Sequence, residues 1–74
     1  MIVKVLIQRY DPKVTKPPFK FINLGETEIE ETEDDYLGEE RYERLVGACR
    51  ARGFRFKSYS LANEKGYKYT ATVF

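Results

Sequence analysis

The side chains best suited to chemistry in this 74-residue chain are carboxylates, and most of them lie in one short segment. Residues 26–40 hold nine of the twelve acidic residues and no basic residue. Residues 1–25 carry a net charge of +4 and residues 41–74 a net charge of +6. Because such crowding costs self-repulsion, the segment predicts binding to a cationic partner surface. A solvated loop leading into a helix with acids at its start is the alternative interpretation of the same charges.

The predicted partner-binding residues are the acids of this segment and two apolar side chains beside them. They are Glu28, Glu30, Glu31, Glu33, Asp34, Asp35, Tyr36, Leu37, Glu39 and Glu40. Closely spaced carboxylates can imitate a nucleic-acid backbone, so the pattern favours a protein partner with a basic, nucleic-acid-binding site. A small viral or mobile-element inhibitor, such as an anti-CRISPR or polymerase-blocking protein, has this size and charge.

No residue pattern typical of catalysis is found, and we do not expect an enzyme. The chain has no histidine, which removes Ser–His and Cys–His activation of a nucleophile. Its single cysteine, Cys49, falls on the apolar side of a predicted helix, where a thiol packs as a small hydrophobic group. The five glycines are scattered and form no phosphate-binding loop.

The same residues predict no cofactor, no dedicated metal site and no membrane contact. One cysteine and no histidine exclude an internal disulfide and the usual zinc sites. The acidic run lacks the alternating ligands and central glycine of a calcium-binding loop. No apolar stretch approaches the ~20 residues of a membrane-spanning helix, and residues 1–7 do not resemble a secretory signal. We therefore expect a reducing cytoplasm, that of a host cell if the gene is viral.

A second hypothesis places single-stranded nucleic acid on basic and aromatic residues near the C-terminus. Rings can stack on bases while cations contact phosphates. The predicted residues are Arg55, Lys57, Tyr59, Tyr67, Lys68 and Tyr69. The same residue types also fill the core and border of a small sheet, and a net charge of +1 is low for a dedicated nucleic-acid binder. We therefore rank direct nucleic-acid binding below protein binding.

Apolar periodicity predicts two strands in the first third of the chain. Residues 2–10 alternate apolar side chains on one face and form the first strand. Pro17 and Pro18 exclude a central strand at their position. The β-favouring residues 19–24 form a second strand, antiparallel to the first. Residues 26–33 are ambiguous, because Thr27 and Ile29 permit a strand extension whereas charge repulsion favours a solvated connection.

The start of the chain also resembles a known hairpin. Residues Lys4-Val-Leu-Ile-Gln-Arg-Tyr-Asp-Pro12, followed by Pro18-Phe19, are similar to the first hairpin of succinate dehydrogenase iron–sulfur subunits. This resemblance implies a hairpin over residues 2–24. The cysteines that bind the cluster in that family are missing, since Cys49 is the only thiol, so no iron–sulfur function follows.

A helix is predicted to begin between Thr32 and Gly38 and to end at Arg52. Its apolar stripe consists of side chains at helical spacing: Tyr42, Leu45, Val46 and Cys49. Acids near its start and arginines near its end suit the helix dipole. Gly53 follows as the left-handed residue that ends the helix.

Residues 54–61 and 67–74 are predicted to form a second hairpin around residues 62–66. The order β-β-α-β-β then gives one α+β domain over residues 1–74, with one helix packed on one face of a four-stranded, mainly antiparallel sheet. A single helix leaves the other face uncovered. Some of five aromatic residues are expected there or at an edge: Tyr10, Phe19, Tyr59, Tyr67 and Phe74. A homodimer formed through that face or edge is the third hypothesis.

Overall fold

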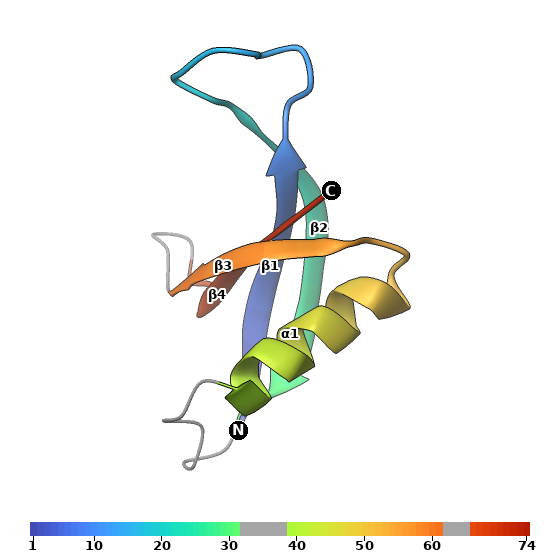
Figure 1. Ribbon diagram of the computed structural model, residues 1–74. Coiled ribbons are helices and arrows are strands. Elements are labelled where there is room, and N and C mark those ends of the chain that lie inside the picture. Colours follow the sequence, from blue (N-terminus) through green and yellow to red (C-terminus); the bar gives the residue numbers. More distant parts are fainter. Residues whose placement is uncertain (32–38, 62–65) are drawn as a thin grey trace.

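The apolar alternation of the first predicted strand is realised in β1 (Ile2–Tyr10), which lies in the centre of a four-stranded sheet (Figure 1). The computed structural model describes residues 1–31, 39–61 and 66–74. The other elements are β2 (Phe21–Glu30), α1 (Glu39–Ala51), β3 (Phe56–Leu61) and β4 (Tyr69–Val73). The predicted β-β-α-β-β order and the α+β class are confirmed.

The strand order across the sheet is β2-β1-β4-β3. The pairs β1–β2 and β3–β4 are antiparallel, whereas the central strands β1 and β4 are parallel. Two of the three pairings are therefore antiparallel, as expected, and the central pair makes the sheet mixed. A parallel partner requires a long crossover, which β2, α1 and β3 provide here. The sequence alone left this strand order open.

The core lies between α1 and one face of the sheet. Its buried members are Val3, Val5, Ile7, Ile29, Leu45, Cys49, Tyr69, Ala71 and Val73. The predicted helix stripe is correct for Leu45 and Cys49, which are fully buried, and wrong for Tyr42, which is exposed. Tyr42 instead packs edge-to-face on Phe56 at the border of the sheet, with ring centroids 5.1 Å apart. The helix thus turns its Leu45–Cys49 edge toward the sheet.

The end of α1 follows the predicted glycine cap. Gly53 has a φ of 84°, in the left-handed region. The Phe54 amide donates to the Cys49 carbonyl at 3.0 Å, and the Gly53 amide donates to the Arg50 carbonyl at 2.9 Å. These two bonds form a Schellman motif, which satisfies carbonyls that the helix end leaves open. The motif turns Phe54 back onto the core.

The second strand is longer than predicted, and the solvated connection that charge repulsion favours after Gly25 is wrong. β2 continues through Glu30, with Thr27 opposite Val5 and Ile29 opposite Val3. Ile29 is buried in the core, and its burial favours the strand despite the acids around it. Charge repulsion is also relieved locally because Glu28 lies opposite Lys4 in the ladder.

The second hairpin has the predicted pairing. β3 and β4 are antiparallel, and all five residues of β4 are buried, as suits a central strand. The connecting residues 62–65 and the predicted helix start between Thr32 and Gly38 lie outside the described residues. Among the helices that the structure describes, none combines the length and apolar character needed to cross a bilayer.

Candidate functional site

Strand β2 carries a row of three carboxylates on one side of the sheet. Glu26, Glu28 and Glu30 alternate with Thr27 and Ile29, and the three acids are exposed. Because Ile29 points into the core, the alternation of a strand places the acids on the face away from α1. β2 is an edge strand, and successive acids of the row are about 7 Å apart. The row therefore faces solvent, although Glu26 also bonds to the Tyr67 hydroxyl and Glu30 to the Met1 amino group.

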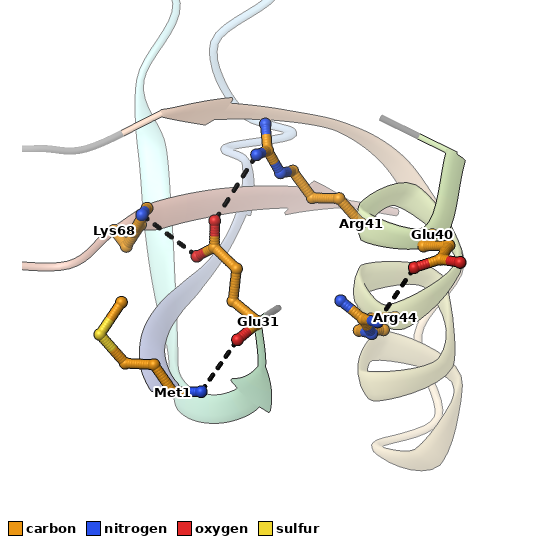
Figure 2. A network of polar contacts seen from close by, with 6 residues as sticks. All are labelled: Met1, Glu31, Glu40, Arg41, Arg44 and Lys68. Atoms are coloured by element: carbon orange, nitrogen blue, oxygen red, sulfur yellow. Dashed lines mark hydrogen bonds and ion pairs between the residues drawn. The ribbon is translucent and has the colours of Figure 1, made fainter. Parts of the chain in front are cut away.

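Glu31 follows this row but is buried between cations from two other elements (Figure 2). Its Oε1 lies 3.5 Å from Nη2 of Arg41 in the first turn of α1, and its Oε2 lies 3.2 Å from Nζ of Lys68, just before β4. The Glu31 amide donates to the Met1 carbonyl at 2.8 Å, and the Met1 amino group donates to the Glu31 carbonyl at 2.9 Å. Glu31 thus joins the helix to the sheet.

Tyr69 lies beside this network and is fully buried. The Arg41 guanidinium carbon is 5.5 Å from the centroid of its ring. The Tyr69 hydroxyl makes no hydrogen bond within the part of the chain that the structure describes. Burial, followed by the neighbouring carboxylate of Glu31, raises the pKa of Tyr69 to about 12. The hydroxyl is therefore neutral near pH 7, and Tyr69 is a core residue.

Two further acids form exposed ion pairs. The Glu30 carboxylate accepts from the Met1 amino group at 2.7 Å, and Arg44 Nη2 lies 3.3 Å from Glu40 Oε2, one helical turn away. Exposed pairs of this kind are worth at most about 1 kcal/mol, because water competes for both charges. Glu30 and Glu40 therefore stay available to a stronger cationic partner.

Glu28 and Glu39 are exposed and form no ion pair within the described residues. Together with Glu30 and Glu40 they define what we call the acidic end, because the end of β2 and the start of α1 lie at the same end of the molecule (Figure 1). The remaining predicted partner-binding residues, Glu33, Asp34, Asp35, Tyr36 and Leu37, lie outside the described residues. Glu31, being buried, is not part of this surface.

The residues predicted to bind nucleic acid do not form one open surface. Tyr69 is fully buried and Tyr59 packs against the core, so neither ring is free to stack on a base. Lys68 pairs with Glu31. The Tyr67 hydroxyl donates to the Glu26 carboxylate, which raises the pKa of Tyr67.

Arg55 and Lys57 are exposed, as is Lys68, and Arg55 and Lys57 lie at or just before the start of β3. Arg55 and Lys57 border different parts of the molecule. Arg55 borders a hollow of about 360 Å³ between α1 and the start of β3, together with Arg50, Tyr42 and Phe74. The Nζ of Lys57 instead lies 4.5 Å from the ring centroid of Tyr10.

An exposed aromatic cluster lies where the β1–β2 loop leaves the sheet. Tyr10 contacts both Phe19 and Phe21, with centroid distances of 5.8 and 4.8 Å. Tyr10, Phe19 and Phe74 are exposed, as expected from the sequence, whereas Tyr59 and Tyr67 are partly buried. Phe21 was not among the residues expected to be exposed, because a few strand residues beside a loop do not show which face of the strand is buried. Its neighbours Phe19 and Lys20 are the signal that identifies the cluster.

Nothing in the described chain has the geometry of a nucleophile or a metal site. Cys49 is buried, and desolvation raises the pKa of its thiol, an effect that nearby Arg52 only partly offsets. Within residues 1–31, 39–61 and 66–74, no three acidic or cysteine side chains come together to hold a metal ion.

Comparison with protein-family models, with characterised proteins and with solved structures finds no match to this chain. The functional argument therefore depends on the geometry and charge described above.

Proposed function

We propose that this chain is a non-enzymatic protein-interaction module whose acidic end binds a basic surface on a partner protein. The observation that carries the proposal is the position of Glu28 and Glu39. Both are exposed, both lack an ion pair within the described residues, and they come from two elements that meet at one end of the molecule. Lys4 lies opposite Glu28 in the ladder, but a partner that supplies arginine or lysine to this end gives Glu28 and Glu39 the direct ion pairs that the described part of the chain does not.

The protein's own cations neutralise only part of the negative charge of this acidic segment. Met1, Arg41, Arg44 and Lys68 each contact a carboxylate of residues 30–40. The sequence adds Glu33, Asp34 and Asp35 between β2 and α1, with no basic residue among them. The resulting excess of negative charge steers a basic partner toward this end at low ionic strength.

The class of partner that we propose is an enzyme with a basic groove for nucleic acid. Carboxylates about 7 Å apart along an extended strand present a regular line of negative charge, to which a groove built for phosphates is complementary. An inhibitor from a virus or mobile element that occupies such a groove is the biological setting we propose. The support for it is size and charge alone.

The test compares two double variants that lose the same number of negative charges and so have equal net charge. The partner captured from the native host by the immobilised protein is purified, and its Kd is measured against two double variants. Glu28→Gln with Glu39→Gln removes two charges from the acidic end. Asp11→Asn with Glu43→Gln removes two charges from positions outside the acidic end.

We expect the first double variant to raise Kd at least about tenfold and the second to raise it less than about threefold. The wild-type Kd should also rise steeply with salt, because exposed charges are screened. Competing duplex DNA should displace the protein from a nucleic-acid groove. Equal effects of the two variants, or a Kd that is independent of salt, would contradict the proposal.

A further inference from the structure

We infer that the base of the β1–β2 loop binds single-stranded nucleic acid, at the opposite end of the molecule from the acidic end. We call this site the loop surface. It consists of Tyr10, Phe19, Phe21, Lys13, Lys20 and Lys57. The inference is independent of the proposed protein partner, since it uses other residues on another part of the fold.

The three rings of the loop surface are exposed to solvent. Tyr10 is 37% exposed, Phe19 48% and Phe21 49%, although the Tyr10 ring contacts both phenylalanine rings. Exposed aromatic clusters are typical of binding surfaces rather than of solvated loops. Rings held in place by their neighbours lose little conformational entropy when a planar base stacks on them, and base–aromatic stacking tolerates any sequence.

One cation contacts these rings, two more belong to the β1–β2 loop segment, and one acid, Asp11, lies among them. Lys57 lies 4.5 Å above the Tyr10 ring. Lys13 and Lys20 are exposed and form no ion pair within the described residues. The only acid in residues 1–25 is Asp11, whose Oδ1 accepts a hydrogen bond from the Lys13 amide at 2.9 Å. Rings and exposed cations in the same part of the chain suit the bases and phosphates of a nucleic acid.

The loop surface also contains a recess for a base. A hollow of about 310 Å³ lies beside Tyr10 and Phe19, with Pro12 and Val14 as its apolar side and with Asp11 and Lys57 also in its lining. This volume is at the lower end of the range for small-ligand sites. One base therefore fits into the hollow while its phosphate remains beside Lys57.

The acidic end does not oppose this binding, because the two sites are far apart. Tyr10 ends β1, whereas Ile2 at its start pairs with Glu30. A strand of nine residues spans about 30 Å at 3.3 Å per residue. The Debye length at physiological ionic strength is about 8 Å, so the carboxylates are screened from a strand bound at the loop surface. Figure 1 shows the loop extending from the sheet at the end opposite the N-terminus.

The experiment measures fluorescence anisotropy of labelled oligo-dT and oligo-U, about 12 nucleotides long, against wild type and three double variants. Phe19→Ala with Phe21→Ala removes rings, and Lys13→Glu with Lys20→Glu reverses charges. Arg50→Glu with Arg55→Glu is the matched control, since it makes the same charge change at the other hollow. Circular dichroism confirms folding of each variant, and amide NMR shifts of the wild type locate the oligonucleotide.

We expect a wild-type Kd of about 1–100 µM at low salt, with a slope of log K against log salt near about −2 for three phosphate contacts. The ring variant should bind at least about fivefold more weakly. The lysine variant should lose binding, and the arginine control should change it less than about threefold.

Three results would overturn the inference. They are no binding at about 100 µM protein, a larger loss in the arginine control than in the lysine variant, and tighter binding to phosphatidylserine vesicles than to either oligonucleotide. None of these results bears on the acidic end, so the two proposals fail separately.

Discussion

Glu31 shows how one residue position decides between a binding surface and a structural role. Thr27, Ile29 and Glu31 share the side of the chain that faces α1, because side chains of a strand alternate. Glu31 is therefore carried inward, where Arg41 and Lys68 neutralise it. The sequence predicted Glu31 as a partner-binding residue together with Glu30, since residue type alone does not distinguish them. Extending the strand alternation past Ile29 would have placed Glu30 on the outer face and Glu31 on the side that faces α1.

We predict that Glu31→Gln destabilises the fold far more than Glu40→Gln. The first change leaves Arg41 and Lys68 beside a neutral group in a mostly dry site and should cost about 1–3 kcal/mol, less than for a fully buried pair because Lys68 is partly exposed. Glu40 forms an exposed i,i+4 pair with Arg44, and its loss should cost about 0.5 kcal/mol or less. Urea unfolding compares the two. Equal costs would mean that the Glu31 network contributes no more than a surface pair.

At the scale of elements, α1 offers a matched test of its glycine cap. A Cβ added at Gly53 or at Gly47 meets nothing within 4 Å, so the two sites differ in backbone conformation rather than in space. Gly53→Ala places a side chain at a φ of 84° and should cost about 1–3 kcal/mol. Gly47→Ala lies within the helix and should stabilise by about 0.5–1 kcal/mol. Thermal unfolding of both variants checks the opposite signs, and a neutral Gly53→Ala would contradict the Schellman cap.

Local sequence signals predicted the bounds of these elements well, but they did not predict which distant strands pair. β1 has the predicted bounds of 2–10, and the helix ends one residue before the predicted Arg52, with Gly53 as its cap. β2 was predicted too short because repulsion among its acids was weighed without Lys4, which lies opposite Glu28 only once the strands pair. The parallel pairing of β1 with β4 joins residues more than 60 positions apart, which periodicity does not encode.

Because strand pairing could not be predicted from the sequence, the exposure of the candidate site residues could not be predicted either. Tyr69 was predicted to stack on bases because it lies among lysines in the sequence, but a central strand buries its side chains on both faces. Exposed rings occur instead at Tyr10 and Phe19, where the chain leaves the sheet. Sequence reasoning located the charge segments correctly in the chain, but it did not show which side chains would remain exposed.

For the whole molecule, the main property is the separation of opposite charges. The net charge is only +1 and the sequence pI is about 7.8, yet the acidic end and the lysines of the loop lie near opposite ends of a molecule 39 Å long. Acids on the edge strand β2 also oppose edge-to-edge pairing of two copies. The sheet-edge homodimer is therefore disfavoured at β2. Head-to-tail attraction between opposite ends is expected instead.

We predict that this attraction appears in static light scattering as a negative second virial coefficient at low ionic strength, which rises as salt screens the charges. The control is a charge swap, Glu28→Lys with Lys13→Glu and Glu39→Lys with Lys20→Glu. It keeps the net charge of +1 and removes the separation of charge. The swapped variant should lose the salt dependence while its circular dichroism is unchanged. An association that persists in about 1 M salt, where the Debye length is about 3 Å, would instead indicate an apolar homodimer and contradict the electrostatic explanation.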